Sequence, residues 1–250
     1  MTSFPDKPLA GRVAVVTGAS RGIGRAASLA LAEAGAHIIA VARTQGALEE
    51  LDDAIKAAGS SATLVPLDLT DYDGIDRLGG AIYERWKRLD IVIGNAGILG
   101  NLTPLGHVTP KAWAQVMDVN VTANWRLLRS LDPLLRASDA GRAVFVTSGA
   151  AQKCRAYWGS YAVSKAALDA LVRTYAAETE TTPVRAMLLN PGPLRTAMRH
   201  AAMPGEDPAT LRTPEDLAPA FVRLARPDWM ESGKIYDFPT DRVVAFQPPA

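Results

Sequence analysis

Tyr161 and Lys165 lie four residues apart in an Ala- and Leu-rich stretch, 160–168, that contains neither Gly nor Pro. Such a stretch predicts a helix, and on a helix the residues i and i+4 share one face, so an ammonium is held close to a phenol. A free tyrosine has a pKa of about 10, and a nearby cation favours the phenolate and lowers that pKa. We therefore expect Lys165 to lower the pKa of Tyr161 and make it a proton carrier near neutral pH. The same spacing also occurs on solvated helices, so the rest of the chain decides its meaning.

A glycine-rich turn follows the first predicted strand. Its sequence, Thr17-Gly18-Ala19-Ser20-Arg21-Gly22-Ile23-Gly24, has the spacing GxxxGxG and runs directly into a predicted helix. Glycines allow a tight strand-to-helix turn and a close approach of the backbone to a pyrophosphate. The helix N-terminus then offers N–H groups and the positive end of its dipole to the phosphates. The turn predicts a dinucleotide-phosphate site, although glycines after a strand also serve in ordinary turns.

The end of the second predicted strand bears on which dinucleotide binds. NAD sites usually carry Asp or Glu about twenty residues beyond the glycine turn, on the ribose hydroxyls. Here that place holds Ala42 and Arg43, and Arg21 lies inside the glycine turn. Two guanidinium groups can hold a 2′-phosphate. We therefore predict NADP(H) as the preferred cofactor and NAD(H) as the alternative, in which Arg43 stacks on the adenine or lies in solvent.

These motifs lie in a chain that alternates short β-branched runs with longer helical patterns. Runs such as 13–16 are continuously apolar, as is typical of strands buried on both faces. Regular alternation predicts an α/β fold, with a three-layer α/β/α, doubly wound parallel sheet of about seven strands. We expect strands at Arg12–Thr17, Ala36–Ala42, Ala62–Leu67, Leu89–Gly94, Ala143–Ser148, Val184–Asn190 and Lys234–Phe238. We expect helices at Gly22–Ala34, Gln45–Ala58, Tyr72–Trp86, Lys111–Leu135, Tyr157–Thr179 and Pro214–Ala225, with Gly35 and Gly59 as C-terminal caps.

The chain of 250 residues suits one large domain with a full core. We therefore predict a single dinucleotide-binding and catalytic domain over 1–250. The least regular stretch is 197–213, which contains Pro204, Gly205 and Pro208. Long loops in compact domains are often functional, so we expect a substrate lid there, with a plain surface loop as the alternative.

Composition excludes several function classes. The formal charge of +1 gives no general attraction to nucleic acid or anionic membranes. A single cysteine, Cys154, leaves no partner for an internal disulfide. The three histidines are scattered along the sequence without the spacing of metal ligands, so we expect no metal centre. The chain starts without an apolar segment of signal-peptide length and has no run of the roughly twenty apolar residues that span a bilayer. We expect a cytoplasmic protein without metal, nucleic-acid partner or membrane anchor.

Taken together, these motifs resemble the short-chain dehydrogenase/reductase family over essentially the whole chain. The resemblance rests on residues that recur in one order: the 17–24 turn, Asp68-Leu69, Asn95-Ala96-Gly97, Asn120, Ser148, Tyr161, Lys165, Pro191-Gly192 and Thr196. Most follow the carboxyl ends of predicted strands, where ligands bind in open parallel sheets. The resemblance implies a Rossmann-type fold and a hydride transfer between NADP(H) and a carbonyl compound or secondary alcohol.

The resemblance also implies a catalytic role for four residues. Tyr161 looks like the acid/base, and Lys165 looks like the residue that lowers its pKa and holds the nicotinamide ribose. Ser148 looks like the hydroxyl that orients the substrate carbonyl. Asn120 looks like the residue that anchors a water in a proton relay toward Lys165. Locally, Ser148 could instead cap a turn, and Asn120 could bond within its own helix.

Further residues match the cofactor contacts of the family. Asp68 is similar to the residue on adenine, Asn95 to one that stabilises the central sheet, and Thr196 to one on the carboxamide or phosphates. Asp68 is alternatively a helix N-cap, a place for which Asp71 competes. The full predicted cofactor set is Gly18, Ser20, Arg21, Gly22, Ile23, Gly24, Arg43, Asp68, Leu69, Asn95, Ala96, Gly97, Tyr161, Lys165, Pro191, Gly192 and Thr196.

The substrate is the least determined part. Residues expected near the pocket suggest an apolar or aromatic molecule, or else packing under the lid: Leu99, Cys154, Tyr157, Trp158, Leu194, Met198 and Met203. The family usually pairs two helices between subunits, and Trp113 and Trp125 fit a homodimer or homotetramer as well as a monomer core. One alternative function is a dinucleotide-binding sensor or scaffold without redox turnover. Another is an isomerase or dehydratase that uses the cofactor transiently.

Overall fold

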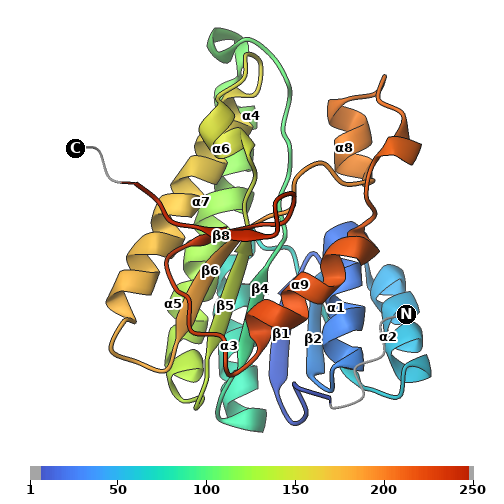
Figure 1. Cartoon of the computed structure of the whole chain (residues 1–250), viewed down its shortest axis with the longest axis vertical. Helices are drawn as coiled ribbons and strands as arrows, with labels where there is room; N and C mark the ends of the chain where they lie inside the picture. Colours follow the sequence, from blue (N-terminus) through green and yellow to red (C-terminus); the bar gives the residue numbers. More distant parts are fainter. Residues whose placement is uncertain (1–6, 248–250) are drawn as a thin grey trace.

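The computed structural model describes residues 7–247 and places one sheet between two layers of helices (Figure 1). The strand order is β3-β2-β1-β4-β5-β6-β7-β8, and every pair is parallel except β7 with β8. The strands span Val13–Thr17 (β1), His37–Ala42 (β2), Ala62–Pro66 (β3), Ile91–Gly94 (β4), Arg142–Val146 (β5), Arg185–Asn190 (β6), Ile235–Asp237 (β7) and Arg242–Val244 (β8). The expected Rossmann-type sheet is confirmed.

The last strand, β8, was not predicted from the sequence. It has three residues and pairs antiparallel with β7 across a turn in which Asp241 has a φ of 51°. Side chains hold the turn: the hydroxyl of Tyr236 donates to Asp241 Oδ1 at 2.6 Å, and Arg223 lies 3.1 Å from the same carboxylate. A three-residue edge strand carries too short a pattern to be recognised from its period.

The helices divide between the two faces of the sheet (Figure 1). The helices α1 (Gly22–Glu33), α2 (Gln45–Ala57) and α9 (Pro214–Ala225) pack on one face, and α3 (Tyr72–Trp86), α5 (Ala123–Arg136) and α7 (Gly159–Glu178) pack on the other. The expected helix 111–135 is α4 (Pro110–Met117) and α5 joined by a π-helical turn at Asp118–Thr122. No helix within residues 7–247 is long and apolar enough to cross a membrane.

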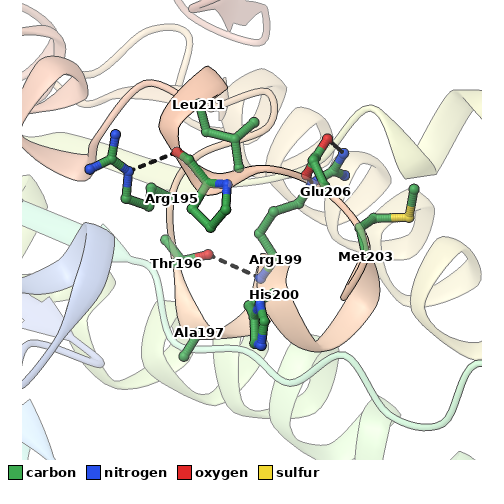
Figure 2. Close-up of a pocket in the computed structure, with 9 residues that line it drawn as sticks. Arg195, Thr196, Ala197, Arg199, His200, Met203, Glu206 and Leu211 are labelled. Carbon is green, nitrogen blue, oxygen red and sulfur yellow. Dashed lines mark hydrogen bonds and ion pairs between the residues drawn. The ribbon is translucent and has the colours of Figure 1, made fainter.

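The stretch 197–213 is more regular than expected. It begins with the helix α8 (Ala197–Ala202), and Thr196 Oγ1 caps that helix by accepting from the N–H of Arg199 at 3.1 Å. The guanidinium of Arg199 donates two 2.6 Å bonds to the carboxylate of Glu206, and Arg195 Nε donates to the carbonyl of Pro208 at 2.9 Å (Figure 2). Ion pairing therefore shapes this segment where the proline and glycine residues indicated only a loop.

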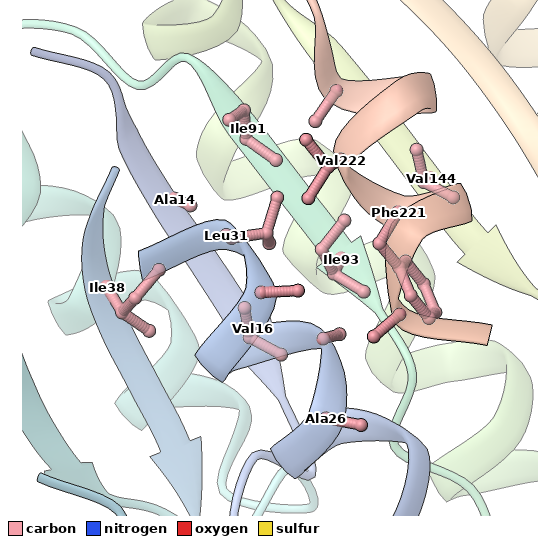
Figure 3. Close-up of a cluster of buried hydrophobic side chains, with 14 of the residues drawn as sticks. Ala14, Val16, Ala26, Leu31, Ile38, Ile91, Ile93, Val144, Phe221 and Val222 are labelled. Atoms are coloured by element: carbon pink, nitrogen blue, oxygen red, sulfur yellow. The ribbon is translucent and has the colours of Figure 1, made fainter. Parts of the chain in front are cut away.

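The core follows from the alternation of side chains along each strand. In β1, Ala14 and Val16 join the cluster under α1 and α9, while Val13 and Val15 face α3, α5 and α7. Figure 3 shows the first cluster, where residues of β1, β2, β4 and β5 meet Leu31 of α1 and Phe221 of α9. Both faces of the central strands are thus buried, which explains their continuously apolar sequence.

The strand order reverses direction at one point of the carboxyl edge, between β1 and β4. The chain starts in the middle with β1 and adds β2 on one side and β4 on the other. The connections after β1 and β4 therefore leave the sheet in opposite directions, and open parallel sheets bind ligands at such a point. Gly18 and Asn95 directly follow these two strands.

Two adjacent glycines of α3 test the helix packing. A Cβ on Gly79 would lie 2.2 Å from Ser130 Oγ of α5, whereas nothing lies within 4 Å of a Cβ on Gly80. We expect Gly79→Ala to lower the free energy of unfolding by about 1–3 kcal/mol through overpacking. Gly80→Ala should raise it by about 0.5–1 kcal/mol, because alanine favours helix more than glycine does. Denaturant unfolding measures both, and equal effects would contradict the α3–α5 contact.

Candidate active site

The glycine turn brings α1 directly over the end of β1. Gly18 has a φ of 64° and Gly22 a φ of 53°, values that favour glycine. A Cβ on Gly24 would lie 2.2 Å from the carbonyl oxygen of Gly18 and 2.5 Å from Asn95 Nδ2. The third glycine is therefore required by close packing of the helix against the turn, as the spacing predicts.

The beginning of α1 suits an anionic group. Its N-cap, Arg21, makes no side-chain capping bond, and its first turn contains no acidic residue. The first N–H groups of a helix have no partner within the helix, and they carry the positive end of its dipole. Together with the close backbone packing of the turn, these features fit the pyrophosphate of a dinucleotide.

A buried threonine, Thr17, joins the ends of β1 and β4 through hydrogen bonds with Asn95, an arrangement that we call the Thr17 clasp. Thr17 Oγ1 accepts from the N–H groups of Asn95 (3.0 Å) and Ala96 (3.1 Å) and donates to the carbonyl of Ile93 at 3.2 Å. Asn95 Nδ2 returns a bond to the carbonyl of Thr17 at 2.9 Å. The structure thus supports the predicted sheet-stabilising part of Asn95. Thr17 is a residue of the candidate site that the sequence did not predict, because the only indication is a single hydroxyl side chain at the end of an apolar strand.

Asn120 lies in the π-helical turn and is fully buried. Its side chain accepts from the N–H of Ile98 (2.8 Å) and donates to the Ile98 carbonyl and to Ser164 Oγ, both at 2.9 Å. Its main-chain carbonyl accepts from Asn124 Nδ2 at 2.8 Å. Asn120 therefore ties the segment after β4 to α7, beyond the local bonding considered from sequence, and its part in a water relay stays a prediction.

Tyr161 and Ser148 come together, but the expected effect of Lys165 on Tyr161 is not seen. Burial raises the pKa of Tyr161 above its usual value, and hydrogen bonding by Ser148 lowers it to a smaller extent. The expectation that Lys165 lowers this pKa is wrong for this structure: the ammonium lies 5.8 Å from the centre of the phenol ring and is turned to another acceptor. Ser148 Oγ also accepts from the N–H of Ala150 at 3.2 Å, so its turn-capping alternative holds as well.

Lys165 is buried behind the tyrosine, at 4% exposure. Its ammonium donates to the carbonyl of Val146, the last residue of β5, at 2.8 Å. Burial lowers the pKa of Lys165 to about 8, and the charge of Asp169 opposes that shift. Lys165 therefore fixes α7 against β5 and carries a readily changed charge next to Tyr161.

The predicted adenine side is open to solvent. Arg21, Arg43 and Asp68 are exposed, and Arg43 Nη1 lies 3.9 Å from Asp68 Oδ2, a weak pair at such exposure. Bonds from the N–H and hydroxyl of Thr70 lower the pKa of Asp68, with a smaller contribution from Arg43. Asp71 is the N-cap of α3, so the alternative reading of Asp68 as the cap is wrong. Leu69 is buried in the core cluster of α3 and α5.

The segment after β6 lies beside the glycine turn. Gly192 has a φ of 65°, and a Cβ on Gly22 would lie 3.7 Å from Thr196 Cγ2. Asn190 Oδ1 accepts from the N–H groups of Gly149 (3.0 Å) and Gly192 (3.3 Å), so it joins the segments after β5 and β6. The sequence predicted Asn190 only as the end of a strand, because no local pattern shows that its side chain joins two loops.

The residues expected to form one substrate pocket are dispersed. Leu194 is 3% exposed and belongs to the core, which favours the packing alternative for this residue. Tyr157, with a φ of 72°, is 60% exposed, and the Trp158 ring meets Tyr161 edge-on with centroids 6.0 Å apart. Met203 lines a cavity of about 350 Å³ that is bounded only by residues of 195–211 and excludes Tyr161 (Figure 2).

Comparison with known proteins agrees with this geometry. Residues 12–207 match the family model described as short chain dehydrogenase. The oxidoreductase YciK of Escherichia coli K12 is 39% identical over 220 residues, 87% of each chain. Its structure superposes with a TM-score of 0.89, covering 95% of this chain and 99% of that chain at 38% identity.

The descriptions of two further relatives mention a cofactor. A short chain dehydrogenase from Shigella flexneri, solved in complex with NADP, has a TM-score of 0.88 at 37% identity and covers 93% of this chain and 98% of that chain. An NAD-dependent oxidoreductase of Mycobacterium tuberculosis CDC 1551 is 37% identical over 204 residues, 76% of this chain and 74% of the relative.

The hydrogen bonds of Thr17 allow a test of how the ends of β1 and β4 support cofactor binding. Thr17→Val keeps the shape but leaves the buried N–H groups of Asn95 and Ala96 without their acceptor. We expect the free energy of unfolding to fall by about 1–3 kcal/mol and NADPH to bind more weakly, as measured by denaturant unfolding and cofactor fluorescence. Thr17→Ser keeps the hydroxyl and should retain most of both. Wild-type stability and affinity in Thr17→Val would show that the clasp is unimportant.

Proposed function

Because this chain belongs to the short-chain dehydrogenase/reductase family, we propose that it transfers a hydride between NADP(H) and a carbonyl compound or secondary alcohol. The observation that carries the proposal is the placement of Tyr161 and Ser148 together, with the buried Lys165 one helical turn on. The bound dinucleotide supplies or accepts the hydride, which is chemistry that side chains cannot provide.

In the proposed reduction, the chain's own residues handle the proton. A raised pKa means that the Tyr161 phenol holds its proton at neutral pH. That proton can pass from Tyr161 Oη to a carbonyl oxygen as negative charge develops there. The Ser148 hydroxyl is placed to orient the same oxygen. Because burial disfavours the phenolate, Tyr161 carries its proton when a carbonyl compound binds.

For the cofactor, we propose NADP(H) over NAD(H). Arg21 and Arg43 are exposed cations at the ends of the turn and of β2, and the only carboxylate near Arg43 within the described chain is the weakly paired Asp68. A 2′-phosphate is a stronger partner for an arginine than an exposed carboxylate at 3.9 Å. The NADP complex of the Shigella relative supports this preference, and the NAD-dependent mycobacterial relative supports the alternative.

For the substrate, we propose an apolar or aromatic carbonyl compound. Tyr157 and Leu105 are each 60% exposed and lie on neighbouring segments, because the N–H of Thr103 donates to the carbonyl of Tyr157 at 3.0 Å. A Cβ on Gly159 would lie 2.5 Å from Leu105 Cδ1, so Leu105 packs against the start of α7, two residues before Tyr161. An exposed apolar rim so near the phenol suits an apolar substrate better than a charged one.

The homo-oligomer remains a prediction. Trp125 of α5 is 45% exposed, whereas Trp113 of α4 is half-buried. A large exposed aromatic residue on a helix face suits a contact with a second copy.

Tyr161→Phe tests the central role directly. The variant removes the hydroxyl and keeps the ring, so we expect kcat for reduction to fall by about 10²–10⁴-fold with NADPH affinity unchanged. NADPH consumption with a panel of aromatic aldehydes and ketones measures the first quantity, and fluorescence titration the second. Tyr83→Phe, at an exposed tyrosine of α3, is the matched control and should behave as wild type. Undiminished turnover in Tyr161→Phe refutes the assignment. NADPH binding without turnover of any carbonyl by the wild type would favour a sensor or scaffold.

Arg43→Met tests the cofactor preference. Loss of a charge-assisted bond to the 2′-phosphate should weaken NADPH binding by about 10–100-fold and leave NADH binding unchanged. Arg129→Met, at an exposed position of α5, serves as the control for loss of one surface charge. Tighter binding of NADH than of NADPH by the wild type would overturn the proposal.

A further inference from the structure

Three consecutive residues, 146–148, lie at the end of β5 and just after it, and each lies next to one side chain of α7. The carbonyl of Val146 accepts from Lys165 Nζ at 2.8 Å. The hydroxyl of Thr147 donates to Asp169 Oδ1, and Ser148 lies near enough to the Tyr161 phenol to lower its pKa. The three partners lie four residues apart on α7, so they form one face of that helix. Two of these contacts belong to the proposed reaction, and the third, at Asp169, has no assigned part.

Asp169 is in an unusual place for a carboxylate. It is 5% exposed, and Thr147 is 2% exposed. It is the only acidic residue between 140 and 177. Among the described residues the other buried carboxylate is Asp90, which precedes β4 and pairs with Arg12 just before β1 at the opposite edge of the sheet. A buried carboxylate costs free energy unless it is hydrogen-bonded and has a counter-charge.

The buried cation next to Asp169 along α7 is Lys165, which lies one turn earlier on the same face of that helix. Lys165 has one hydrogen-bond partner, an uncharged carbonyl, and burial works against its charged form. Asp169 opposes this effect, and the other charged group that acts on Asp169 is Arg173, one turn further along α7. Tyr161, over whose ring Lys165 Nζ lies, and Thr147, which bonds to Asp169, are further titratable and hydrogen-bonding groups next to the pair.

We propose that Asp169 is a positioning residue of the reaction: its carboxylate, held by Thr147, keeps the buried ammonium of Lys165 charged and turned toward the end of β5. The inference rests on the proposed function, because a charged Lys165 would serve to hold the nicotinamide ribose of a bound cofactor. A purely structural Asp169 would tie α7 to β5 without influencing the charge of Lys165.

Asp169→Asn separates these two roles. Asparagine keeps the size of the side chain and can still accept from Thr147, but it carries no charge. We expect the alkaline limb of the pH profile to move down by about one pH unit, because Lys165, whose pKa is about 8, loses its proton earlier. The kcat for aldehyde reduction should therefore fall by about twofold at pH 7 and by close to tenfold above pH 8, with KM little changed. Asp169→Glu restores the charge and should recover most of the rate. Glu178→Gln removes an exposed carboxylate at the end of the same helix and should leave the profile unchanged.

Thr147→Val gives a second, opposite signature. The Thr147 hydroxyl favours the ionised form of Asp169, so its loss should move the acidic limb of the profile upward and leave the alkaline limb in place. This variant keeps the proposal testable if Asp169→Asn does not fold. A wild-type profile in both folded variants, even with lower thermal stability, would overturn the proposal.

NADPH binding measured against pH, by fluorescence, distinguishes this inference from the proposed function. If the wild type reduces no carbonyl compound, the proposed function fails. A downward shift in the alkaline limb of NADPH binding in Asp169→Asn would still support the link between Asp169 and Lys165. An unshifted binding profile would overturn that link.

Discussion

The burial of one ammonium group is the constraint on which the candidate site depends. Lys165 is almost fully buried, so its charge must be met by fixed partners, which are the carbonyl of Val146 and the field of Asp169. These partners fix the register of α7 against the end of β5. The same register brings Tyr161 to Ser148, because Val146 and Ser148 lie two residues apart at the end of β5 and just after it, and Lys165 and Tyr161 lie on successive turns of α7.

The second half of the site comes from the topology of the sheet. The carboxyl ends of β1 and β4 are neighbours from which the chain departs in opposite directions, and Thr17 with Asn95 holds them together. The glycine turn and the free N-terminus of α1 lie on one side of this clasp. Asn120 connects the clasp side to α7 through Ile98 and Ser164. The glycine turn and Tyr161 are thus parts of one hydrogen-bonded framework.

Much of this framework could be predicted from the sequence, because strand ends and helix faces follow from the hydrophobic period. The order of the motifs placed Gly24 and Tyr161 in the correct helices, and Asn95 and Ser148 at the carboxyl ends of the correct strands. The hydrophobic period does not show how deeply a polar group is buried. Burial raises the pKa of Tyr161, whereas the sequence predicted that it would be lowered. The period also does not show which apolar residue lines a pocket, and Leu194 proved to be core. The π-helical turn at Asn120 and the strand β8 depend on tertiary contacts that no local pattern encodes.

The most direct test of the central claim is the fate of the hydride itself. NADPH deuterated at C4 of the nicotinamide, incubated with the wild-type protein and an aromatic aldehyde in ordinary water, should give an alcohol with deuterium on the former carbonyl carbon and a solvent-derived proton on oxygen. Nuclear magnetic resonance of the product measures the carbon-bound deuterium, because the hydroxyl proton exchanges with water. Stereospecific deuterium transfer is the predicted result, whereas alcohol formed without deuterium, or no alcohol from any aldehyde tested, would contradict a tyrosine-assisted hydride transfer.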